Sequence, residues 1–164
     1  MNPTRTPQFG VEIGNIAYGF STHKDALSDA MNRCIDVALI LWNQDVIDLM
    51  SAVLDDWNLS SNGIEPSEGL GKIEDLIETG NPGVVVFDLD PPYSRSSRIA
   101  WQLVDRFPDR SFVLTCADPV LAVKSAPWLS RHPIFQKPYE TNKLAGTIRS
   151  LAIRALRSLA MVAR

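Results

Sequence analysis

Short apolar runs alternate with amphipathic segments along most of the chain, and this alternation constrains the fold more than any other feature. Two of the runs, residues 37–41 and 84–87, contain no polar residue. Such runs are typical of strands buried on both faces, as in a parallel sheet covered by helices. Because strand and helix candidates alternate five times, the sequence predicts an α/β fold with a doubly wound, five-stranded parallel sheet and helices on both faces.

The predicted elements form one main domain, residues 37–164, preceded by an extension, residues 1–36, that is partly helical over residues 24–35. Strands are expected at residues 37–41, 60–64, from 84 onward, 111–115 and 133–136. Helices are expected at residues 46–57, 69–79, 120–129 and 141–162, with another around 99–104 after a polar loop. The helix at 46–57 is predicted to bury one apolar face, made of Val46, Leu49, Met50, Val53, Leu54 and Trp57.

Composition and charge argue against several classes of protein. The chain has 164 residues, of which 45% are hydrophobic, enough for one core, and its net charge of −3 argues against wholesale nucleic-acid or membrane binding. No apolar run reaches membrane-spanning length, and the start lacks the apolar core of a signal peptide. Its two cysteines have neither disulfide-framework numbers nor metal-ligand spacing. We therefore expect a soluble, cytoplasmic chain.

Three polar side chains of complementary chemistry stand at the predicted carboxyl ends of strands three, four and five. They are Asp88, Thr115 and Lys137, separated by 27 and 22 residues. Because parallel strands present their carboxyl ends at one edge of the sheet, these side chains should converge. An aspartate can accept a phosphoryl group while a hydroxyl and an ammonium contact its oxygens. Without a competing metal, Asp88 and Lys137 would instead form a structural ion pair.

In these residues the chain resembles the receiver domains of two-component response regulators, over residues 37 to about 155. The motifs are VVVFDLDPP at residues 84–92, LTCAD at 114–118 and FQKPYETNKL at 135–144. The resemblance implies a flavodoxin-like topology, with Asp88 at the phosphoacceptor position, Thr115 at the switch hydroxyl and Lys137 at the phosphate-contacting lysine. It also implies a cis peptide before Pro138.

The sequence departs from this family where a pair of acids, just after strand one, would hold Mg²⁺. That stretch reads Trp42, Asn43 and Gln44, which carry no charge. Mg²⁺ binds oxygen ligands and favours carboxylates, so its affinity is expected to fall sharply. We expect Trp42 to fill the vacated space. The resemblance is therefore to an atypical receiver, or pseudo-receiver, without the acidic pair.

Two further positions differ from the family, and one carboxylate has an open role. Ile134 stands at the aromatic switch position, and Tyr93 and Ser96 stand where loop glycines are expected. Asp90 could at most join Asp88 as a metal ligand; we expect it to cap the loop backbone through an Asx-type hydrogen bond.

The last predicted helix combines an apolar stripe with a basic face. From residue 141 onward the charge is +5, while residues 1–140 carry −8. The residues expected to mediate interactions are Arg149, Arg154, Arg157, Leu156 and Leu159. The helix extends past what a five-stranded sheet can cover, so its far end should pack on the extension or on a second copy, giving a homodimer.

From these features we expect a stand-alone receiver-like module that acts in signal transduction by protein–protein interaction, independently of phosphorylation. It would have no enzymatic activity and no cofactor, and its partner would be a protein such as a histidine kinase or another regulator. One alternative is a phosphorylatable receiver that accepts a phosphoryl group on Asp88 with weak Mg²⁺ binding. The second is a phosphatase, because Asp88 and Asp90 also resemble the first motif of haloacid dehalogenase-like enzymes; only Glu140 follows Lys137 where that family needs an acidic cluster.

Overall fold

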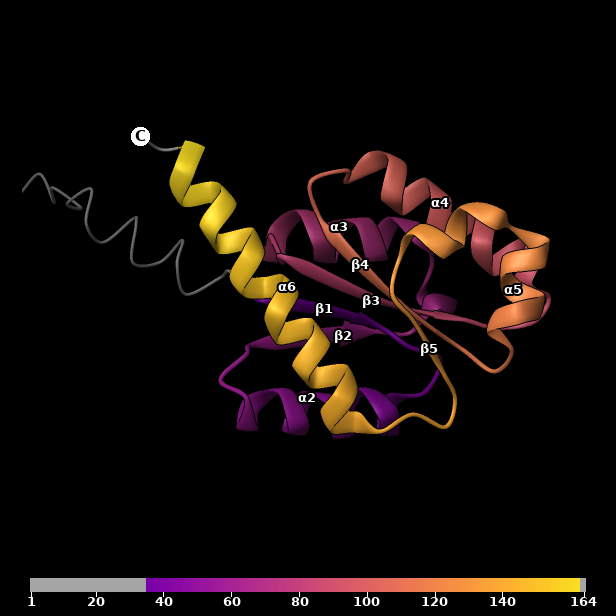
Figure 1. The fold of residues 1–164 in the computed structure, drawn as a ribbon, viewed down its shortest axis with the longest axis horizontal. Helices are drawn as coiled ribbons and strands as arrows, with labels where there is room; N and C mark the ends of the chain where they lie inside the picture. Colours follow the sequence, from indigo (N-terminus) through magenta and orange to yellow (C-terminus); the bar gives the residue numbers. More distant parts are fainter. Residues whose placement is uncertain (1–34, 163–164) are drawn as a thin grey trace, which may run out of the picture. The chain divides into compact units, whose positions relative to one another are not determined.

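A computed structural model of the chain describes residues 35–162, which alternate strands and helices in the predicted order (Figure 1). The strands are β1 (Val37–Ile40), β2 (Ser61–Ile64), β3 (Val84–Leu89), β4 (Ser111–Cys116) and β5 (Ile134–Gln136). The helices are α2 (Gln44–Asp56), α3 (Leu70–Gly80), α4 (Tyr93–Arg106), α5 (Pro119–Ser125) and α6 (Thr141–Val162), with short 3₁₀ turns η1 (Pro66–Glu68) and η2 (Pro127–Arg131).

The five strands form one parallel sheet in the order β2-β1-β3-β4-β5. This is the flavodoxin-like order, in which the chain direction across the sheet reverses next to β1 and leaves a crevice at the carboxyl ends of β1 and β3. The predicted doubly wound fold is therefore confirmed. In the register of β3 and β4, Asp88 lies opposite Thr115, so both side chains reach the same edge.

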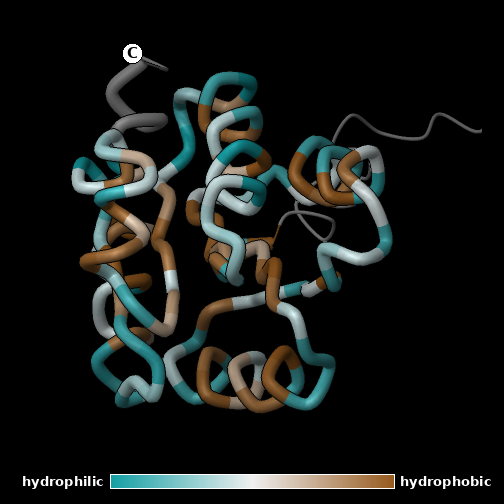
Figure 2. The backbone as a smooth tube through the Cα atoms, turned by 90° about the vertical axis from the view of Figure 1, so that its right-hand side faces the viewer, coloured by the Kyte–Doolittle hydropathy of each residue, from teal (hydrophilic) through white to brown (hydrophobic). Residues whose placement is uncertain are grey.

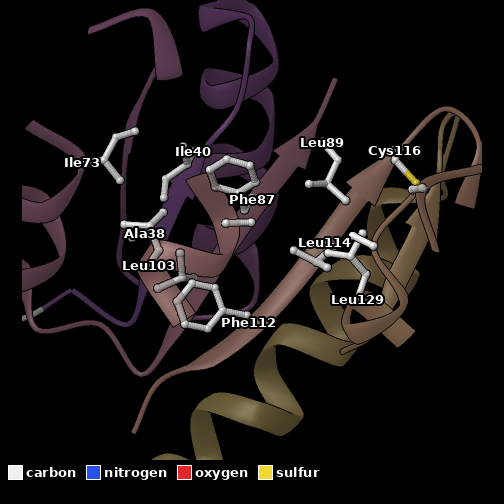
Figure 3. Close-up of a cluster of buried hydrophobic side chains, with 14 of the residues drawn as sticks. Ala38, Ile40, Ile73, Phe87, Leu89, Leu103, Phe112, Leu114, Cys116 and Leu129 are labelled. Atoms are coloured by element: carbon white, nitrogen blue, oxygen red, sulfur yellow. The ribbon is translucent and has the colours of Figure 1, made fainter. Parts of the chain in front are cut away.

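Two hydrophobic clusters, one on each face of the sheet, hold the helices in place. One face of the sheet packs against α3, α4 and α5, and Figure 3 shows part of this cluster, including Ile40, Phe87, Leu103 and Phe112. The other face packs against α2 and α6. Because successive strand residues point to opposite faces, β1 and β3 contribute to both clusters and are buried throughout. Along the helices, hydrophobic and hydrophilic residues occur together within single turns (Figure 2), as expected for helices with one buried side.

Two helices differ from the prediction. The segment expected to be a polar loop is the first part of α4, which begins at Tyr93 because this side chain and Ser96 are buried against the sheet. The helix expected over residues 120–129 is interrupted: α5 ends at Ser125, and η2 begins at Pro127. Proline has no N–H for a helical hydrogen bond and disfavours helical backbone at the residue before it, which explains the break.

The predicted extension and its helix at residues 24–35 lie almost entirely outside the described residues. The boundary at residue 36 therefore stays a prediction. None of the helices within residues 35–162 is both long and apolar enough to cross a membrane.

Candidate functional site

The three predicted residues meet at the carboxyl edge of the sheet, around the carboxylate of Asp88. The Thr115 hydroxyl donates to Asp88 Oδ1 over 2.9 Å. The Lys137 ammonium contacts both carboxylate oxygens, with Nζ 2.7 Å from Oδ1 and 2.9 Å from Oδ2. Asp88 and Thr115 are buried, and Lys137 closes the site from the solvent side at the end of β5. The expected ion pair between Asp88 and Lys137 is therefore present.

Burial and the two partners act in opposite directions on Asp88. Burial raises the pKa of this carboxyl because the charged form loses its hydration. The hydrogen bond and charge of Lys137 and the hydrogen bond of Thr115 lower the pKa, and burial outweighs them, so that the pKa lies above the ordinary aspartate value of 3.8. Loss of either partner would therefore raise the pKa of Asp88 further.

The stretch after β1 contributes an aromatic ring and a helix cap where the resemblance would place acids. Trp42 donates its indole N–H to the backbone oxygen of Asp88 over 3.1 Å, and its side chain is 38% exposed. Asn43 is the N-cap of α2 and accepts the backbone N–H of Asp45 over 2.8 Å. The side-chain amide of Gln44 donates a hydrogen bond to Asp48 Oδ1 within α2, over 2.8 Å. This stretch therefore secures the β1–α2 connection with uncharged side chains.

The arrangement does not fit Mg²⁺. Within residues 35–162, no group of three His, Cys, Asp or Glu side chains is placed to hold a metal ion. A hard divalent cation needs several oxygen ligands, with carboxylates to offset its charge. Here the one carboxylate at the centre already has both oxygens on Lys137.

Asp90 does not have the role that was predicted for it. Its side chain is exposed and makes none of the hydrogen bonds found among the described residues, so the expected Asx-type cap is wrong. The hydroxyl of Ser96 donates to the backbone oxygen of Asp90 over 2.9 Å instead. The loop is thus fixed by a serine from α4, which leaves the carboxylate in solvent.

Two proline peptides at this edge are cis. The Lys137–Pro138 bond is cis, as the resemblance implies, and the Pro91–Pro92 bond is also cis, which the sequence analysis did not identify.

An apolar cleft of about 570 Å³ adjoins the carboxylate. We call it the Trp42 cleft; its lining is Leu41, Trp42, Asn43, Val46, Leu49, Met50, Asp88, Lys137, Pro138, Tyr139 and Thr141. The apolar pattern of the sequence does not indicate this cleft, because it places Leu49 on the buried face of α2. In the structure Leu49 is 55% exposed, and Ile47, one residue outside the predicted stripe, is buried. The tyrosine after the Lys-Pro pair was the signal that could have indicated an aromatic wall.

The predicted interaction residues lie on α6 with different surroundings. The Arg149 guanidinium lies over the Trp57 ring, 5.7 Å from its centroid. Arg154 and Arg157 are exposed. The side chains of Leu156 and Leu159 lie outside the described part of the helix, so their roles stay predictions.

The fold of the described residues is similar to that of solved receiver domains. Among solved structures, the signal receiver domain of a LuxO repressor protein from Vibrio parahaemolyticus has a TM-score of 0.61 at 17% identity, covering 77% of this chain and 97% of its own. A CheY-like receiver from Methanospirillum hungatei has a TM-score of 0.62 at 10% identity, covering 76% and 98%. The receiver domain of Nitrogen Regulatory Protein C has a TM-score of 0.59 at 14% identity, covering 74% and 96%.

At these identities the likeness concerns the fold. No protein-family profile matches the chain, and no curated protein matches it. The neighbours named here are receiver domains, and this likeness of fold does not favour the phosphatase interpretation.

Proposed function

We propose that the chain is an atypical receiver-like module that acts in signal transduction by binding a protein partner, without accepting a phosphoryl group and without enzymatic activity. The observation that carries this proposal is the closed site around Asp88. Its carboxylate is bonded by Thr115 and Lys137, and the neighbouring position after β1 is taken by Trp42.

This geometry opposes phosphoryl transfer for a physical reason. The acceptor carboxylate would have to leave its lysine partner, and the charge of the incoming group would lack a divalent cation. Lys137 alone supplies one positive charge, which Asp88 already neutralises. Phosphorylation would replace the single charge of the carboxylate by up to two charges on the acyl phosphate, and Lys137 would offset only one of them in this buried site.

The partner is proposed to be a protein such as a histidine kinase or another regulator. Helix α6 supplies a basic face that could meet an acidic surface, and a second copy of the chain is the alternative occupant. Cytoplasmic location and the absence of a bound cofactor belong to the same proposal.

The test is incubation with acetyl phosphate and Mg²⁺, followed by intact-mass measurement. We expect no phosphoryl adduct on the wild-type chain. A stoichiometric adduct that is lost in Asp88→Asn and kept in Asp90→Asn would overturn phosphorylation independence. The Asp90 variant is the matched control because it removes an exposed carboxylate two residues away.

One observation favours the alternative of a phosphorylatable receiver. Asp88, Thr115 and Lys137 keep the relative positions that phosphoryl transfer would use. The adduct experiment decides between the two functions, and a magnesium titration of the same sample would show whether weak metal binding accompanies any adduct.

A further inference from the structure

We propose that the Trp42 cleft is a binding site for a small, uncharged, largely apolar molecule. This inference goes beyond the proposed function and does not rest on it, because it concerns the lining of the cleft and not the fate of Asp88.

The charge of the lining identifies the class of ligand. Of the eleven residues that line the cleft, only Asp88 and Lys137 are charged. They neutralise each other at 2.7 Å, so a charged ligand would have no opposite charge free to meet it. Moving an ion out of water into such surroundings costs more than its contacts return. An uncharged ligand avoids this cost.

The size and shape of the cleft favour a small molecule. Sites for such ligands are typically about 300–1,000 Å³, mostly apolar, with a few polar groups that fix orientation. The volume here, about 570 Å³, falls within this range. Leu41 and Met50 are fully buried and form the floor, while Trp42 and Leu49 are exposed at the rim.

The polar groups of the lining add hydrogen-bonding capacity without net charge. An ammonium has three N–H donors, and the carboxylate of Asp88 has two oxygens to receive them. Lys137 therefore keeps a donor beyond those two oxygens, and Thr141 and Asn43 add a hydroxyl and an amide. Burial raises the pKa of Tyr139, which keeps its phenol uncharged. A ligand with an apolar body and one hydroxyl or carbonyl group matches this set.

The position of the cleft also suits a ligand site. Its walls come from the ends of β1, β3 and β5, at the point where the strand order reverses next to β1. Open α/β sheets bind ligands at this crevice. In this chain Trp42 and the apolar side chains of α2 line the crevice. A pair of metal-binding carboxylates at the same place would make it polar.

The experiment uses three probes that share one ring system and differ in charge: 2-naphthol, 2-naphthoate and 2-naphthylmethylammonium. Each is titrated into the ¹⁵N-labelled full chain and followed by amide chemical shifts. We expect 2-naphthol to give saturable shifts at residues 41–50 and 137–141, with a Kd of about 1 mM or tighter, as for a fragment of this size. Both charged probes should bind at least about fivefold more weakly.

Two exposed leucines provide the matched variants. Leu49→Glu places a carboxylate on the rim of the cleft, and Leu121→Glu makes the same change at a 49% exposed position on α5. Leu49→Glu should weaken 2-naphthol binding at least about fivefold, because the new charge must be desolvated, and Leu121→Glu should leave it unchanged. Tighter binding of a charged probe, equal effects of the two variants, shifts centred elsewhere, or no saturable binding would each overturn the proposal.

Discussion

At the scale of single residues, Asp88 is governed by a balance between burial and its two partners. Burial raises the pKa of the carboxyl group in this position, and the contacts from Lys137 and Thr115 lower it. Because the folded-state pKa is raised, the folded chain holds the proton more tightly than the unfolded chain. Ionisation of Asp88 therefore lowers the free energy of unfolding as the pH rises from 3.8, the ordinary pKa, to the folded-state pKa. At pH values above the folded-state pKa, this loss of stability is constant.

Replacing Lys137 by Met should raise the pKa of Asp88 further, because the substitution removes both a hydrogen bond and a positive charge that lower it. The measurement is the ¹³C chemical shift of the Asp88 carboxyl as a function of pH. Lys143→Met is the control, since Lys143 is exposed and pairs with Glu140. An Asp88 pKa that stays unchanged or falls in Lys137→Met would contradict this assignment of the ion pair.

The residues of the site could be predicted only where sheet topology dictates their position. Asp88, Thr115 and Lys137 follow from strand ends and spacing, because parallel strands share a carboxyl edge. The hydrogen bond from the Trp42 indole and the exposure of Asp90 depend on side-chain rotamers and loop geometry. Neither is encoded in spacing, so both required the structure.

At the scale of elements, α2 shows how far an apolar pattern determines which side of a helix is buried. Its periodicity predicted a helix, and the structure confirms one at Gln44–Asp56. The buried side of α2 consists of Ile47, Met50 and Leu54. The helix packs against β2 of the sheet and against α6. Leu49 belongs to the sequence stripe yet lines the cleft, because the packing of α2 against β2 and α6 determines which side of the helix is buried.

The contact between α2 and β2 requires a glycine at position 63. A Cβ at Gly63 would overlap Ile47 Cγ2 and lie 3.3 Å from Leu39. Gly63→Ala should therefore lower the free energy of unfolding by about 1–3 kcal/mol, the usual cost of overpacking a core. Urea unfolding measures it.

The control for this prediction is Gly71→Ala in α3, where nothing lies within 4 Å of an added Cβ. This change should leave stability equal or raise it by about 0.5–1 kcal/mol, because alanine favours the helix. Equal effects of the two substitutions would show that Gly63 is not a close-packing position.

The β1–α2 connection can also be changed to test what limits metal binding. The double variant Trp42→Asp with Asn43→Asp adds two carboxylates to the cleft lining that contains Asp88, and aspartate keeps the N-cap role of Asn43. We expect the variant to bind Mg²⁺ measurably tighter than the wild type by titration calorimetry, because carboxylates favour a hard divalent cation.

A control with the same charge change is Val120→Asp with Leu121→Asp, at exposed positions of α5. This pair should leave Mg²⁺ affinity unchanged. If the wild type already binds Mg²⁺ as tightly as the Trp42 and Asn43 variant, the uncharged side chains at positions 42 and 43 are not what determines metal affinity here.

At the scale of the whole molecule, the fold was predictable because alternation, strand burial and chain direction all require the same sheet. The strand order and the two helical layers follow from rules of connection that leave few alternatives.

The surfaces of the molecule were less predictable than its fold. Helices α2 and α6 lie on the same face of the sheet, and within α2 all charged residues are acidic while within α6 all are basic. Only the structure shows that these two oppositely charged helices pack on the same face.

The position of α2 and α6 on one face of the sheet suggests how a second copy would bind in the proposed homodimer. A two-fold axis beside the two helices would set the acidic α2 of each copy against the basic α6 of the other, since a two-fold interface uses the same surface on both copies. Such an interface should weaken as salt is added, because exposed charges are screened.

Sedimentation measures this assembly. Ile153 is 41% exposed on α6, between Arg149 and Arg157. We expect the wild-type chain to sediment as a concentration-dependent dimer at low salt and Ile153→Glu to sediment as a monomer, because the carboxylate removes an apolar contact. Val120→Glu makes the same kind of change at an 81% exposed position on α5 and should leave the dimer intact. A wild-type chain that is monomeric at all concentrations, or a dimer that Val120→Glu disrupts as strongly as Ile153→Glu, would place the partner surface elsewhere than on α6.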